Sequence, residues 1–149
     1  MNSSIANLDE QFAVLDQRSC ELTKRLTAET LYLKAPGSEH SSGEQLLRSA
    51  AVVERAFGGL TANLWDDPFE WTLPETLDSP EKVLEYLAEV ETTRKHAFDS
   101  FKGDQDLSKE IMTPCGTTQV LSLLLDTLQQ ARHHQQCAIA AFDFLQRGN

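Results

Sequence analysis

Apolar side chains recur every three or four residues along four long segments of the chain. This spacing places them on one face of a helix and predicts that the face turns towards a core. The first segment spans residues 5–26 and the second residues 46–64. The third spans residues 83–101, with Arg94 among the apolar positions, and the fourth spans residues 120–145. The pattern therefore predicts four long helices.

Local signals predict where these helices begin and end. Ser41 and Glu44 match a capping box, in which the Ser41 hydroxyl accepts from the Glu44 backbone N–H and the Glu44 carboxylate reaches back. Ser79 is a predicted N-cap, because Pro80 and an acidic residue follow it at the start of the helix. The predicted ends of the first three helices are Pro36-Gly37, Asp67-Pro68 and Gly103.

The fourth segment carries two neighbouring apolar stripes. Such a wide apolar face predicts that this is the most buried of the four helices. The first stripe comprises Leu121, Leu124, Leu128, Ala131, Gln135, Ala138, Phe142 and Leu145, and the second comprises Val120, Leu123, Thr127, Gln130, His134, Cys137, Ala141 and Phe144.

The remaining segments are predicted to be connections. In residues 68–82, Phe69, Trp71 and Leu73 alternate with polar residues, which predicts a short extended strap over the core. Residues 103–118 are predicted to be a loop. Gly58 and Gly59, inside the second segment, mark either a break or a close helix contact, because glycine weakens a helix interior.

These elements together predict an all-α fold, a four-helix bundle in which short connections allow antiparallel neighbours. No sequence period of 20 to 50 residues repeats, and no low-complexity segment marks a second domain. We therefore expect one domain that spans residues 1–149.

Composition excludes several classes of function. The 149 residues carry a formal net charge of −10 without a cluster of Lys and Arg, so nucleic acid is not an expected partner. No apolar run reaches the ~18 residues of a membrane span, so a membrane is not an expected partner either. The first residues lack the basic and apolar regions of a secretion signal, so we expect a cytoplasmic protein. Cys20, Cys115 and Cys137 fit neither a disulfide framework nor a CxxC site and are expected to be reduced thiols.

Three motifs follow one another along the chain: HSSGEQLLR at residues 40–48, TPCG at residues 113–116 and QARHHQQ at residues 130–136. Their order resembles the DinB/YfiT-like superfamily of four-helix-bundle metalloenzymes. That family has a W-S-x-G-E type opening of the second helix, a T-P-x-G loop and H-x-x-x-H-R-G-Q on the last helix. The motifs are partly kept here, since His40 stands in place of the tryptophan and residues 135–137 read Gln-Gln-Cys.

The resemblance implies a divalent metal, zinc or nickel, held by three histidines. One lies on the second helix, and two are spaced i, i+4 on the last helix, where they share a face and can reach one ion. Carried onto this chain, the three positions fall on Arg48, or on Ser49 if the register shifts by one, and on Gln130 and His134. Because only His134 remains a strong ligand, we expect no tightly held metal and assign no other cofactor.

Other ligand sets are weaker. Pairing His133 with Gln129 restores no ligand. His134 and Cys137 lie three residues apart and share a helix face, but this pair lacks a third donor. His96 lies off the apolar stripe of the third helix and is expected to be in solvent.

If Arg48, Gln130 and His134 converge as the family's ligands do, they replace a metal ion by a guanidinium, an amide and an imidazole. Such a group suits an anion such as a carboxylate, because arginine offers a fork of donors. In the alternative interpretation, Arg48 extends into solvent or pairs with Glu44 one helical turn earlier.

Two functions from different classes follow. The first is a bundle with a degenerate metal site that binds a small ligand or a protein partner. The alternative is an enzyme: the resemblance implies a metal-dependent transferase or hydrolase that acts on a small molecule, with a thiol as co-substrate. Cys115 is a candidate nucleophile, because it is expected to lie just before a helix start, where the helix dipole favours a thiolate. The resemblance also implies a homodimer.

Overall fold

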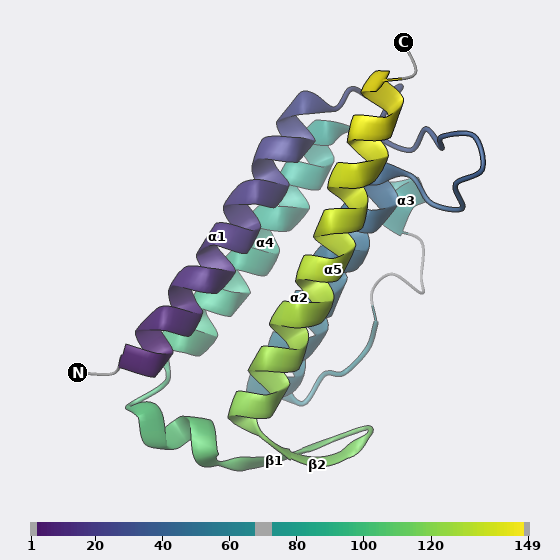
Figure 1. Ribbon diagram of the computed structural model, residues 1–149. Helices are drawn as coiled ribbons and strands as arrows, with labels where there is room; N and C mark the ends of the chain where they lie inside the picture. Colours follow the sequence, from purple (N-terminus) through teal and green to yellow (C-terminus); the bar gives the residue numbers. More distant parts are fainter. Residues whose placement is uncertain (1–2, 68–72, 148–149) are drawn as a thin grey trace.

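The computed structural model describes residues 3–67 and 73–147. Within these ranges the chain is mostly helical, with a small two-stranded sheet (Figure 1). None of the helices in these ranges is long and apolar enough to cross a membrane. The elements are α1 (Ser3–Arg25), α2 (Ser42–Ala62), α3 (Leu73–Thr76), α4 (Pro80–Asp99), η2 (Asp104–Ser108), β1 (Glu110–Thr113), β2 (Gly116–Gln119) and α5 (Val120–Arg147).

The long helices α1, α2, α4 and α5 lie side by side. α2 packs most extensively on α5, and α4 packs on both α1 and α2. α1 and α5 run in one direction and α2 and α4 in the other (Figure 1). The predicted antiparallel arrangement is therefore found for α2 with α5 and for α1 with α4. It is wrong for α2 with α4, because α4 begins at the same end of the molecule as α2.

Both predicted N-caps are confirmed. The Ser41 hydroxyl accepts from the Glu44 amide at 3.1 Å, and the Ser79 hydroxyl accepts from the Lys82 amide at 3.3 Å. The Glu44 carboxylate does not complete the box; it contacts His40 Nδ1 at 3.1 Å. Local side-chain chemistry therefore predicted the starts of α2 and α4 correctly.

The predicted helix ends lie too far along the chain. α2 ends at Ala62 because Asn63 adopts a left-handed conformation with φ 56°, which turns the backbone out of the helix. The Asn63 amide then binds the Gly59 carbonyl at 2.9 Å, and the Leu64 amide binds the Gly58 carbonyl at 3.1 Å. Likewise, α1 ends at Arg25 and α4 at Asp99, before Pro36-Gly37 and Gly103.

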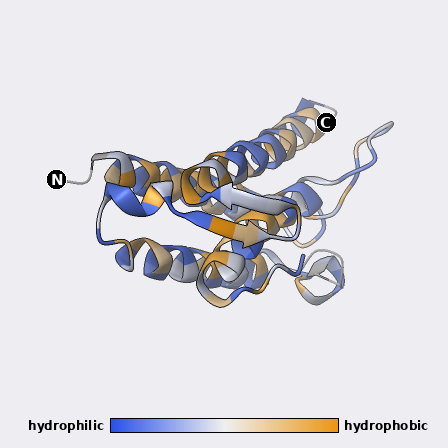
Figure 2. Ribbon diagram, turned by 90° about the horizontal axis from the view of Figure 1, so that it is seen from below, coloured by the Kyte–Doolittle hydropathy of each residue, from blue (hydrophilic) through white to orange (hydrophobic). Residues whose placement is uncertain are grey.

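The predicted loop 103–118 is in fact η2 and most of a β-hairpin. Ile111 pairs with Thr118 and Met112 with Thr117, and Gly116 closes the turn with a positive φ of 119°. Seen from below, the hairpin lies across the lower ends of the helices (Figure 2).

The predicted extended strap is only partly within the described residues. Phe69 and Trp71 lie outside them. Leu73 begins α3, so the strap is not extended at that point.

The core centres on aromatic rings from three helices. The Phe12, Phe57 and Phe98 ring centroids lie 5.3–5.9 Å apart. α2 is more buried than α5, with 12 of 21 residues buried against 8 of 28, so the predicted ranking of these helices is wrong. Part of the difference lies in the second stripe of α5, where Leu123, Gln130 and His134 line a cavity and are not fully buried.

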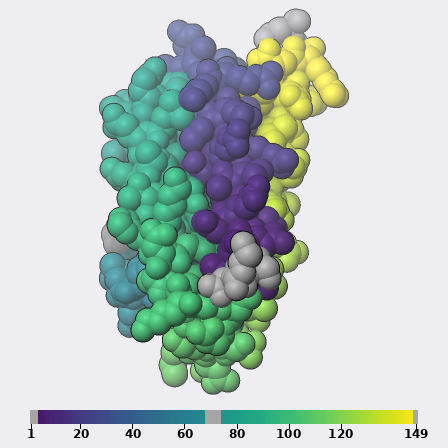
Figure 3. Space-filling view, turned by 90° about the vertical axis from the view of Figure 1, so that its left-hand side faces the viewer, coloured from purple at the N-terminus to yellow at the C-terminus, as the bar shows by residue number. Residues whose placement is uncertain are grey.

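The structure confirms the predicted position of Arg94 on the buried stripe of α4. It is 1% exposed, and its guanidinium forms ion pairs with Asp9 of α1 and Glu91 of its own helix. The guanidinium carbon also lies 5.2 Å from the Phe98 ring centroid. A buried charge needs such partners to offset its desolvation, so Arg94 ties α4 to α1, the two helices seen side by side in Figure 3.

Asp16 of α1 and Glu91 of α4 line a small cavity between α1, α2 and α4. Burial, and then the charge of Glu91, raise the pKa of Asp16 from 3.8 to about 6. Between these pH values the unfolded chain releases a proton that the folded protein keeps, so stability falls as pH rises.

We predict that the free energy of unfolding of the Asp16→Asn variant does not show this decrease with rising pH, and that the variant is more stable than the wild type above pH 6. Urea unfolding at pH 4, 5, 6 and 7 measures it, with Glu10→Gln, an exposed carboxylate on α1, as the control. An Asp16→Asn protein whose stability follows the wild-type pH profile would contradict the prediction.

Candidate functional site

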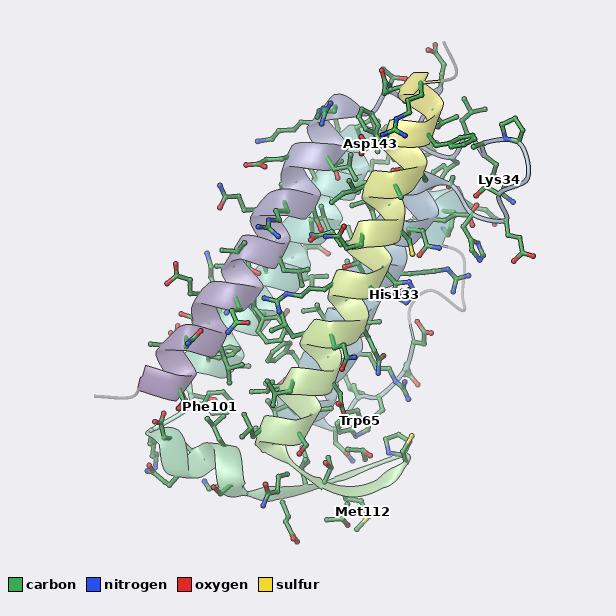
Figure 4. The ribbon with its side chains drawn as sticks, in the orientation of Figure 1. Lys34, Trp65, Phe101, Met112, His133 and Asp143 are labelled. Atoms are coloured by element: carbon green, nitrogen blue, oxygen red, sulfur yellow. The ribbon has the colours of Figure 1, made fainter. Side chains whose placement is uncertain are left out.

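A cavity of about 510 Å³ lies between α2 and α5. The hairpin turn and the residues just after α2 complete its walls. In Figure 4, Met112 marks the hairpin at the bottom of the view, Trp65 lies above it, and His133 lies higher still on α5. Side chains that line the cavity include Arg48, Val52, Arg55, Trp65, Cys115, Leu123, Asp126, Gln130 and His134.

The register of α2 against α5 is set by two serine hydroxyls. Ser42 donates to the Ala138 carbonyl and Ser49 to the Ala131 carbonyl, both at 2.7 Å. The two contacts are spaced by seven residues on each helix, as two antiparallel helices with alanine at the contact allow.

Three residues singled out from the sequence, Arg48, Gln130 and His134, line this one cavity. Arg48 and His134 are half-buried and Gln130 is exposed. Ser49, the alternative to Arg48, is buried against α5 and does not line the cavity. Glu44, the partner proposed for Arg48 in the alternative interpretation, contacts His40 and Lys34.

His134 is held as a neutral imidazole. Its Nδ1 lies 2.8 Å from the side-chain oxygen of the buried Gln45, which can only accept, so Nδ1 carries the proton. Burial, and then the charges of His133, Arg48 and His40, lower the pKa of His134. Its second nitrogen, Nε2, is then an unprotonated acceptor.

The residues at the family's three ligand positions do not fit a divalent metal. His134 is the one imidazole among them, and Arg48 carries a positive charge that opposes a cation. Across residues 3–67 and 73–147, no three His, Cys, Asp or Glu side chains are grouped to hold a metal ion.

The weaker ligand candidates lie apart from the cavity. His133 is exposed, and its Nε2 lies 3.8 Å from Cys137 Sγ. Gln129 and His96 are exposed, as expected for His96. None of these four side chains lines the cavity.

Cys115 lines the cavity from the hairpin turn. The expected position just before a helix is wrong, because β2 separates Cys115 from the start of α5. The Cys115 amide donates to Thr113 Oγ1 at 3.2 Å, which stabilises the turn. The start of α5 is therefore not placed to favour a thiolate at Cys115.

Sequence reasoning missed the role of Trp65. A Cβ added to Gly59 would lie 2.3 Å from the Trp65 ring, so the indole rests directly on the α2 backbone. The indole N–H donates to Asn63 Oδ1 at 2.9 Å, and the Trp65 carbonyl accepts from Arg55 Nε at 2.7 Å. The glycine pair in α2 was the available signal, because it predicted a break or a close helix contact; Gly59 does make a close contact, but with the indole that follows α2 and not with another helix.

Comparison with known proteins adds evidence on the fold. No protein-family model matches the chain, and no curated protein matches it. The chain is similar to the crystal structure of a conserved protein from Enterococcus faecalis, with a TM-score of 0.69, 18% identity and 97% of each chain covered. At this identity the likeness shows the fold alone.

We predict that Gly59→Ala destabilises the wild-type protein but stabilises a Trp65→Ala variant. Alanine favours a helix over glycine by ~1 kcal/mol, but with Trp65 present the added methyl displaces the indole. Unfolding free energies of the wild type, both single variants and the double variant form the cycle that measures this coupling. Equal effects of Gly59→Ala in the two backgrounds would contradict it.

Proposed function

We propose that this chain is a cytoplasmic four-helix bundle of the DinB/YfiT-like kind whose metal site has become a binding site for a small organic carboxylate. The ligand lies in the cavity between α2 and α5, with its carboxylate at Arg48 and Gln130. In this proposal the protein binds its ligand without metal chemistry.

The proposal is carried by one observation: the cavity holds Arg48 at the place where the resemblance puts a metal ligand. A guanidinium binds a carboxylate through two parallel hydrogen bonds, and the amide of Gln130 offers further donors. The volume of about 510 Å³ is in the range of small-molecule sites.

The rest of the lining supports an organic ligand over an inorganic ion. Trp65, Val52 and Leu123 supply apolar surface in the same cavity. Small-molecule sites commonly combine such a surface with a few polar groups that orient the ligand. A ligand with an apolar body and one carboxylate satisfies both parts.

The alternative, a metal-dependent transferase or hydrolase, requires a metal that the Arg48, Gln130 and His134 set does not favour. A catalytic zinc site uses three protein ligands and leaves one place for water. The amide of Gln130 is a weak substitute for an imidazole towards zinc or nickel.

We predict that 3-phenylpropionate, a carboxylate with an aromatic body, binds the wild type and binds Arg48→Gln at least tenfold more weakly. A hydrogen bond to a charged group contributes about 1.5–3 kcal/mol, and tenfold corresponds to about 1.4 kcal/mol. Isothermal titration calorimetry measures both, with Arg132→Gln, an exposed arginine outside the cavity, as the matched control. If neither 3-phenylpropionate nor its 2-hydroxy analogue binds the wild type, or if both variants lose affinity equally, the proposed function is contradicted.

We predict that the wild type does not bind zinc or nickel tightly at this position. The double variant Arg48→His and Gln130→His should gain affinity by orders of magnitude, because it restores three imidazoles and removes a charge that opposes the ion. The control is Arg48→His with Gln129→His, in which the second histidine lies outside the cavity. Tight binding by the wild type, or equal affinities in the two double variants, would show that the ligand positions are misassigned.

We propose that the chain forms a homodimer through α5, as the resemblance implies. Leu125 and Phe144 of this helix are 48% and 56% exposed, which supports an apolar contact there. Light scattering at tens of micromolar should report a dimer for the wild type and a monomer for Phe144→Ser. A monomeric wild type would contradict this assembly.

A further inference from the structure

The cavity presents two groups of opposite hydrogen-bonding character at one end. Arg48 donates, whereas the neutral His134 offers the lone pair of Nε2, because Gln45 fixes its proton on Nδ1 at 2.8 Å. A carboxylate oxygen placed between them is attracted by Arg48 and repelled by that lone pair. A ligand therefore fits best if it brings a hydrogen-bond donor of its own to His134.

The charges around His134 decide which donor this is. Arg48, His133 and His40 are the positively charged or titratable groups whose charges act on its imidazole. An ammonium group next to the carboxylate would meet Arg48, so a neutral hydroxyl is favoured.

Asp126 lines the same cavity two helical turns away from the donor position at His134. It precedes His134 by eight residues on α5, which is about 12 Å along the helix axis at 1.5 Å per residue.

From this arrangement we infer that the cavity selects a 2-hydroxy carboxylic acid with an apolar side chain. The inference rests on the proposed function and names its ligand class. The carboxylate lies at Arg48 and Gln130, the 2-hydroxyl donates to His134 Nε2, and the side chain lies against Trp65. His134 thus determines specificity, and Gln45 is a positioning residue that holds its tautomer.

The test compares 3-phenyllactate, each enantiomer separately, with 3-phenylpropionate, which lacks only the hydroxyl. Isothermal titration calorimetry at pH 8 should give at least tenfold tighter binding of one phenyllactate enantiomer. If both acids bind equally at pH 8, the inference is overturned while the proposed function stands.

A variant of His134 and a matched variant of His133 test this role. His134→Asn keeps a donor at the Nδ1 position for Gln45 and removes the Nε2 acceptor, so the hydroxyl preference should disappear. His133→Asn, a neighbouring histidine outside the cavity, should keep it. If the His134→Asn variant still prefers 3-phenyllactate, the inference is overturned. If neither acid binds the wild type, the proposed function is overturned as well.

Discussion

The close packing of α2 on α5 is the contact on which the rest of the site depends. Ser42 and Ser49 each donate a hydroxyl to a carbonyl of α5, at Ala138 and Ala131. These bonds satisfy buried hydroxyls and fix the register of the two helices, so that Arg48 and His134 line the same cavity. A shift of one residue would turn Arg48 away and bring Ser49 to its place, which changes the chemistry of the cavity entirely.

Much of the helical part of the fold could be predicted because it depends on local chemistry and periodicity. The Ser41 and Ser79 caps and the buried position of Arg94 are read from neighbouring residues. The ends of the helices could not be predicted, because α2 is terminated by the left-handed Asn63 before any proline. The hairpin was missed because its strands are four residues long and mostly exposed, which leaves little apolar alternation.

The family resemblance singled out Arg48, Gln130 and His134, and all three line one cavity, but their geometry was not predicted. Spacing on α5 placed Gln130 and His134 on one face, but the choice between Arg48 and Ser49 depended on contacts with α5 that no local pattern reveals. The contribution of Gln45 was also outside sequence reasoning, since its bond to His134 joins residues that are 89 apart in the chain. Long-range pairing of this kind determines the tautomer of His134, and the tautomer determines which ligand fits.

The central claim is that His134 presents an unprotonated Nε2 to a ligand in the cavity beside Arg48. Nitrogen NMR of protein labelled with ¹⁵N in its histidines measures this directly, with a His134→Asn sample to assign the signal. The account predicts that at pH 7.5 the His134 ring shows a protonated Nδ1 and a bare Nε2, and that 3-phenyllactate shifts the Nε2 signal while leaving His133 unchanged. A proton on Nε2 in the free protein, or equal shifts at His133 and His134, would contradict it.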